Sequence, residues 1–202
     1  MYKTSYNSCK KPTGAREIGH RILVLVALTL LTLLPSQVDA KVYFTPEQAQ
    51  KVCFPKADRF ERKIARFSAE QMKEIKKACG VEVQIPGTRY AMAWQGTKLI
   101  GVVVFDYVLG KSEVIDYCVA LMPDGEVKQI EVLQYRESHG YEIRRPGWRR
   151  QFEKKTSTSK LRLHDDIANI TGATISCRNI TAGVKRVLMT WHLVLRPIIM
   201  KV

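Results

Sequence analysis

The strongest chemical signal in the chain is a short segment at 169–176, which reads Asn-Ile-Thr-Gly-Ala-Thr-Ile-Ser and directly precedes the last predicted helix. Small residues let backbone N–H groups approach a ligand closely. The start of a helix adds unpaired N–H donors and a partial positive charge, which together favour a phosphate group. Thr174 places a hydroxyl at that helix start. Four basic residues upstream are candidates to add positive charge: Arg149, Arg150, Lys154 and Lys155.

The same residues also have a plain structural interpretation. Threonine and serine are favoured helix caps, and glycine is common in turns. Because capped turns are much more frequent than phosphate sites, residue types alone favour the capped turn.

A family resemblance favours the phosphate site instead. The string T-G-A-T-I-S at 171–176 resembles the signature D-x-x-S/T-G-A-T-x-S/T of the FMN-binding domain family, which includes the C and G subunits of sodium-pumping and Rnf-type respiratory complexes. The resemblance implies that Thr174 carries FMN through a phosphoester, installed from FAD by a magnesium-dependent flavin transferase. It implies a cofactor seat made by the flanking residues Thr171, Gly172, Ala173, Ile175 and Ser176.

One position departs from that signature. The aspartate of the family stands three residues before the first threonine, where this chain has Ala168, and Asp165 and Asp166 lie a little further upstream. A transferase that requires the aspartate would leave FMN bound without the covalent bond.

A second stretch also resembles the family, more loosely. Residues 135–142 resemble a loop of the type H-x-E-T-P-G, and residues 147–152 resemble its W-x-x-F continuation. The resemblance implies further cofactor contacts from Glu137, His139, Gly140, Tyr141 and Trp148. Aromatic side chains in a polar loop would stack well on a flavin ring. The alternatives are a surface histidine, aromatic residues of the core and a glutamate that pairs with an arginine.

The predicted function follows from the cofactor. FMN accepts one or two electrons, and the chain has no nicotinamide-binding, haem or iron–sulfur motif and no zinc spacing. A single flavin indicates an electron relay between membrane or periplasmic redox proteins, with no catalytic side chain assigned. The alternatives are a flavin-dependent reductase of a small molecule and a basic binding module without redox chemistry.

The N-terminus predicts export. A basic segment at 1–21 precedes the apolar run 22–34, and Val38 and Ala40 stand at the −3 and −1 positions of a cleavage site. The run is shorter than the roughly 20 residues of a membrane span, so cleavage is favoured over a short signal anchor. The net charge of +14 then indicates membrane head groups or acidic protein partners, and no nucleic acid, outside the cytoplasm.

Four cysteines remain after residue 40. Cys53 and Cys79 each lie beside a predicted helix end, which weakly favours a disulfide between them. Cys118 lies within an apolar strand and is expected to be a buried thiol.

The remaining patterns predict the elements that position the site. Helices are expected after the caps Thr45 and Ser68, and from about Ser176 to Leu195, with one apolar face. Strands are expected at 81–85, 88–94, 98–107, 113–122 and 127–135. Short turns between consecutive strands require antiparallel pairing.

These elements predict an α+β fold with an antiparallel sheet of about five strands covered by helices, and with FMN at the N-terminus of the last helix. The chain divides into a signal segment at 1–40, an N-terminal helical segment at 41–80 and an FMN-binding domain at 81–202.

Overall fold

The computed structural model describes residues 41–200, which form an α+β unit around one six-stranded antiparallel sheet. The predicted signal segment at 1–40 lies outside the described residues. The strand order is β1-β6-β5-β4-β3-β2, so four consecutive strands form a meander with β1 and β2 at its edges. The meander strands are β3 (Gly87–Gln95), β4 (Lys98–Leu109), β5 (Val114–Leu121) and β6 (Val127–Tyr135). Their positions confirm the α+β prediction and four of the expected strands.

The two edge strands were not predicted. β1 (Lys41–Val42) pairs with the end of β6, and β2 (Arg59–Arg66) pairs along β3. β2 reads RFERKIAR and only Ala65 in it is buried, so it lacks the apolar alternation of a half-buried strand. Charged side chains on such an edge also hinder pairing with other chains. The predicted strand at 81–85 is wrong: this segment is a loop with Val83 buried.

Two short helices begin at the predicted caps. α2 (Pro46–Cys53) has a capping box from Thr45 and Gln48, and α3 (Ala69–Cys79) has one from Ser68 and Gln71. In each, the cap hydroxyl accepts a hydrogen bond from the N3 amide, while the N3 side chain accepts one from the cap amide. Gly80 ends α3 in the left-handed conformation, as its position predicted.

The last helix covers one face of the sheet. α5 (Thr174–Thr190) continues through a π-helical turn, η3 (Trp191–Leu195), into α6 (Arg196–Ile199). Its predicted apolar face is confirmed, since Ile180, Val184, Val187 and Trp191 are all buried. The helix begins two residues earlier than predicted, at Thr174 itself.

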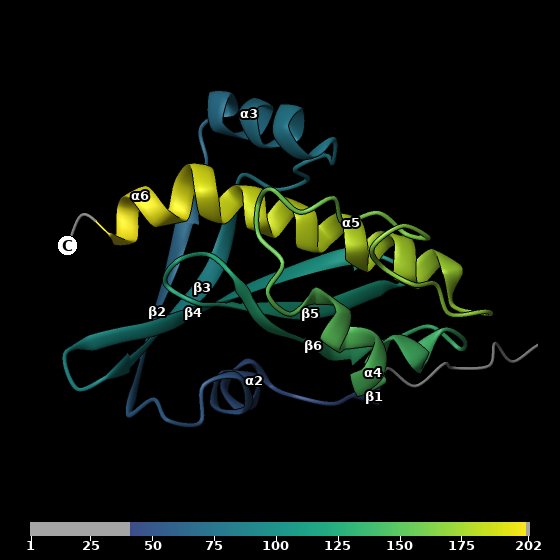
Figure 1. Cartoon of the computed structure of the whole chain (residues 1–202), viewed down its shortest axis with the longest axis horizontal. Helices are drawn as coiled ribbons and strands as arrows, with labels where there is room; N and C mark the ends of the chain where they lie inside the picture. The colour runs from purple at the N-terminus through teal and green to yellow at the C-terminus, as the bar shows by residue number, and fades with distance from the viewer. Residues whose placement is uncertain (1–40, 201–202) are drawn as a thin grey trace, which may run out of the picture. The chain divides into compact units, whose positions relative to one another are not determined.

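Each sheet face carries its own hydrophobic cluster. Figure 1 shows α3 and α5 on one side of the sheet and α2 on the other. Cys79 belongs to the first cluster and Cys53 to the second, where it lies beside Cys118. The favoured Cys53–Cys79 disulfide is therefore absent, because the sheet separates the two thiols; both are free. Cys118 is the buried thiol that was predicted.

The crossover from β6 to α5 is ordered by short helical turns: η1 (Tyr141–Arg144), α4 (Pro146–Arg149) and η2 (Arg150–Phe152). Trp148 and Phe152 pack edge to face and anchor the crossover in the core. Within residues 41–200, no helix is both long enough and apolar enough to cross a bilayer.

Candidate functional site

The first turn of α5 leaves a set of backbone donors without helical partners. Ala173 is the N-cap residue and has no side chain that can accept a hydrogen bond from the turn. The amide of Cys177 bonds to the carbonyl of Ala173 at 2.9 Å, so the amides of residues 174–176 precede the first helical bond. Three N–H groups at the positive end of a 17-residue helix therefore point out of the helix end.

The turn before the helix is tight and open to solvent. Gly172 has a φ of +86°, in the left-handed region that glycine adopts at little cost, and the amide of Ala173 bonds to the carbonyl of Ile170 at 3.0 Å. A Cβ built on Gly172 would meet no atom within 4 Å. Thr171 and Gly172 are exposed, whereas Ala173 is buried beneath the turn. The backbone here is accessible to a bulky anionic group.

Asn169 holds the hydroxyl of Thr174. Its Nδ2 donates a hydrogen bond to Thr174 Oγ1 at 3.0 Å, and its Oδ1 is buried without a hydrogen-bond partner. The sequence signature did not single out Asn169, because it occupies a variable position between Ala168 and Ile170.

The acidic residues upstream do not replace the missing aspartate of the signature. Asp166 accepts hydrogen bonds from the amides of Leu161 and Arg162 and pairs with Lys155 at 2.9 Å. Partial burial alone would raise the pKa of Asp166, but these hydrogen bonds outweigh it and lower the pKa. Asp165 pairs with Lys160 instead. Ala168 contributes its backbone to this region: its carbonyl accepts from the Trp148 indole at 2.7 Å.

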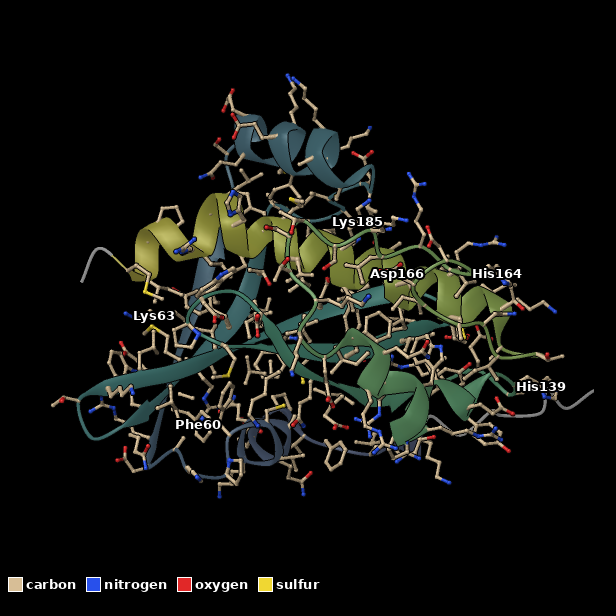
Figure 2. The ribbon with its side chains drawn as sticks, in the orientation of Figure 1. Phe60, Lys63, His139, His164, Asp166 and Lys185 are labelled. Carbon is tan, nitrogen blue, oxygen red and sulfur yellow. The ribbon has the colours of Figure 1, made fainter. Side chains whose placement is uncertain are left out.

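The segment 137–139 faces the helix start across a cavity of about 500 Å³. The cavity is lined by Lys111, Ser112, Glu137, Ser138, His139 and residues 172–176. His139 is exposed, and Figure 2 shows it at the end of the unit where α5 begins. The structure thus brings residues 172–176 together with the 137–139 loop, whereas Thr171 does not line this cavity.

Glu137 lines this cavity and binds the backbone of the turn at Ser112 and Glu113. Its Oε1 accepts hydrogen bonds from the amides of Ser112 at 2.6 Å and Glu113 at 2.9 Å. Partial burial would raise the pKa of Glu137, but the backbone amides and the charge of Lys111 lower it overall. Glu137 therefore stabilises the turn between β4 and β5 and does not form an ion pair with an arginine among the described residues.

Gly140 allows the loop to pack against the helix. It has a φ of +91°, and a Cβ there would lie 2.6 Å from the Tyr135 hydroxyl and 2.9 Å from Ser176 Oγ. Those two oxygens are 3.0 Å apart and hydrogen-bonded, so Ser176 locks the helix to β6 rather than capping it. Burial raises the pKa of Tyr135, which stays a neutral hydroxyl.

Two predicted aromatic contacts lie outside the cavity. Tyr141 is half exposed at the start of η1, and Trp148 is buried in the core with its indole bonded to Ala168. Neither lines the space beside Thr174. Two of the four basic residues upstream form ion pairs elsewhere, Arg149 with Glu131 and Lys155 with Asp166, and none of the four lines this cavity.

The basic residue that does line the cavity is Lys111, which was missed together with Ser112. Both lie in the Gly110-Lys111-Ser112-Glu113 turn, 60 residues before the T-G-A-T tetrad begins. The turn signal was visible in the sequence, but its distance from Thr174 was not.

Comparison with protein families agrees with this site. Residues 110–189 match the family model of the FMN-binding domain, a range that includes the whole cavity lining. Among solved structures, the crystal structure of Shewanella oneidensis NqrC is similar at 18% identity and a TM-score of 0.47, covering 73% of this chain and 83% of that one. No curated protein matches. Residues 110–189 of this chain are similar to an FMN-binding domain, and FMN is the cofactor that such a domain indicates.

Proposed function

We propose that this chain is an exported flavoprotein that carries FMN as a phosphoester on Thr174 and relays electrons between redox partners at the membrane. One observation carries the proposal: Thr174 is the first residue of α5, at a helix start with three outward amides and no capping side chain, beside a cavity of about 500 Å³.

The residues present fit the phosphate end of FMN. The outward amides of 174–176 supply donors, and the helix dipole favours the negative charge. Lys111 adds a positive charge to the lining, and the carboxylate of Glu137 is bound by the backbone amides of Ser112 and Glu113. The helix start therefore supplies backbone donors and a favourable dipole where the phosphate would lie.

Attachment requires one bond change at Thr174. The Oγ–phosphorus bond forms as the bond linking FMN to AMP in FAD breaks, the hydroxyl proton is released, and AMP leaves. A flavin transferase is the partner that this step needs. Asn169 keeps the oxygen in place throughout, because a donated hydrogen bond suits both a hydroxyl and an ester oxygen.

The rest of the lining would hold the flavin ring. Ile175 is exposed and apolar at the cavity, and His139 and Ser138 offer polar contacts on the opposite wall. FMN itself supplies the one- and two-electron chemistry, and the protein supplies binding and orientation. A covalent bond would also prevent loss of the cofactor outside the cytoplasm.

Export is proposed from the N-terminal pattern alone. The mature protein would begin at Lys41. N-terminal sequencing of protein recovered from the periplasmic fraction tests it: an N-terminus at Lys41 supports cleavage, and an intact Met1 in the membrane fraction supports an anchor.

The covalent claim is tested by co-expressing the wild type and Thr174→Ala with the transferase, then recording absorbance spectra and intact masses. The wild type should be yellow and gain one esterified FMN, and Thr174→Ala should gain none. Thr97→Ala, in the exposed β3–β4 turn, is the matched control and should load normally. Yellow protein without added mass would leave FMN bound but not esterified. Colourless protein would favour the non-redox module.

Turnover measurements distinguish an electron relay from a reductase. A relay should accept electrons from a chemical donor and hold them until a redox protein is added. Steady oxidation of the donor by a small molecule alone would favour the reductase.

A further inference from the structure

A second cavity, of about 450 Å³, lies away from Thr174. It shares no lining residue with the cavity beside Thr174. Its wall includes Arg186, which is 12 positions along α5 from Thr174, or roughly 18 Å at the helical rise. The proposed attachment of FMN therefore does not account for this space.

The cavity exists because β4 extends beyond its neighbour. β3 pairs with β4 as far as Arg89 opposite Phe105, and beyond that point β4 pairs only with β5. The side chain of Arg186 occupies part of the uncovered edge. Its Nη2 donates to Asp106 Oδ2 at 2.8 Å and to the Tyr107 carbonyl at 2.9 Å. The loop at 83–87 and the end of β2 form the rest of the wall.

The charges of the lining favour an anion. Its two carboxylates are both compensated, since Asp106 pairs with Arg186 and Asp116 pairs with Arg136. Arg66 and Arg89 are exposed and, among residues 41–200, lie within ion-pair distance of no carboxylate. Two guanidinium groups are thus left to recognise an external acid.

The rest of the lining is largely apolar. Ile64 is 71% exposed and Ile85 is 47% exposed, two of the large hydrophobic side chains that this surface leaves in water. Phe105, which is opposite Arg89 in the register of β3 and β4, continues the apolar wall on the same sheet face. A concave apolar surface with a few polar groups is the usual form of a small-molecule site.

We propose that this cavity binds a small amphipathic anion, with a ring-sized apolar body against Ile64, Ile85 and Phe105 and one acidic group facing Arg66 and Arg89. The volume accommodates one or two fused rings, and the two arginines select a sulfonate, carboxylate or phosphate over a neutral molecule. The site is independent of the proposed FMN ester.

Calorimetric titration of the full protein with naphthalene-2-sulfonate tests the proposal, with naphthalene-2-sulfonamide as the neutral partner. The sulfonate should bind at least roughly tenfold more tightly than the sulfonamide, a factor that one charged contact supplies. The double variant Arg66→Gln/Arg89→Gln should lose that preference. Lys73→Gln/Lys77→Gln removes the same charge from the exposed face of α3 and should keep it.

A second variant tests the position without removing either arginine. Ile85→Glu places a carboxylate at the mouth and should weaken sulfonate binding, while Thr174→Ala should leave it unchanged. Equal binding of sulfonate and sulfonamide, equal losses in both double variants, or dependence of binding on Thr174 would each overturn the assignment.

Discussion

Asn169 Nδ2 donates a hydrogen bond to the hydroxyl oxygen of Thr174 at 3.0 Å, across the turn that opens the last helix. This bond fixes the orientation of the side chain that is proposed to carry the ester. Asn169 directly follows position 168, where the family signature has an aspartate and this chain has an alanine. The hydroxyl is thus held by an uncharged donor, which leaves its own proton free to depart.

Replacing Asn169 with alanine should slow esterification of Thr174 by roughly tenfold, because the hydroxyl then rotates freely and its oxygen loses a donor. Asn169→Asp should be at least as slow, since a carboxylate cannot donate to the ester oxygen. The measurement is a time course of intact mass with FAD and the transferase. Asn179→Ala removes a comparable bond, to the Leu109 carbonyl, and should not change the rate. Equal rates in all variants would contradict a positioning role.

Gly140→Ala should destabilise the fold by about 2 kcal/mol, since the new Cβ would collide with the Tyr135 and Ser176 hydroxyls and φ is +91°. Urea unfolding measures the loss. Gly147→Ala is the control, because no atom lies within 4 Å of a Cβ there. If the two variants are equally stable, the packing of the 136–140 loop against α5 is not as described.

Glu137→Gln should lower the free energy of unfolding by about 1 kcal/mol at neutral pH, because the amides of Ser112 and Glu113 lose a charged acceptor. The pKa of Glu137 is lower in the folded chain than its ordinary value of 4.5. The carboxylate therefore contributes fully above that value, and its contribution is lost as the pH falls through the folded pKa. Urea unfolding of both proteins between pH 7 and about pH 3 should show the difference shrinking. A constant difference would rule out this account.

Among these variants, Arg186→Met should lower the free energy of unfolding most, by about 3–5 kcal/mol, since it leaves the largely buried Asp106 carboxylate without its cation. The two side chains are only 11% and 15% exposed. The exposed pair Lys160–Asp165 gives the comparison: Lys160→Met should change stability by less than about 0.5 kcal/mol. Thermal unfolding distinguishes the two, and similar melting temperatures would contradict the buried role.

Local signals predicted much of this molecule. The capping boxes at Thr45 and Ser68 and the meander from β3 to β6 depend on near neighbours in the chain, so the sequence displays them directly. The placement of Thr174 at a helix start is of the same kind.

Such local signals could not predict which residues far apart in the sequence lie side by side in the fold. Lys111 reaches the site only because the β4–β5 turn folds over the start of α5, and Arg186 is buried only because Asp106 lies opposite it. Strand β2 was missed because an edge strand with charged faces lacks apolar alternation. Trp148 looked like a ring-stacking residue, yet it packs against Phe152 in the core.

Peptide mapping of protein co-expressed with its transferase tests the central claim most directly. After proteolysis, tandem mass spectrometry of the peptide that contains Thr171 and Thr174 should show one FMN, with the fragments assigning it to Thr174. An unmodified Thr174 peptide from protein with no flavin absorbance would contradict the account.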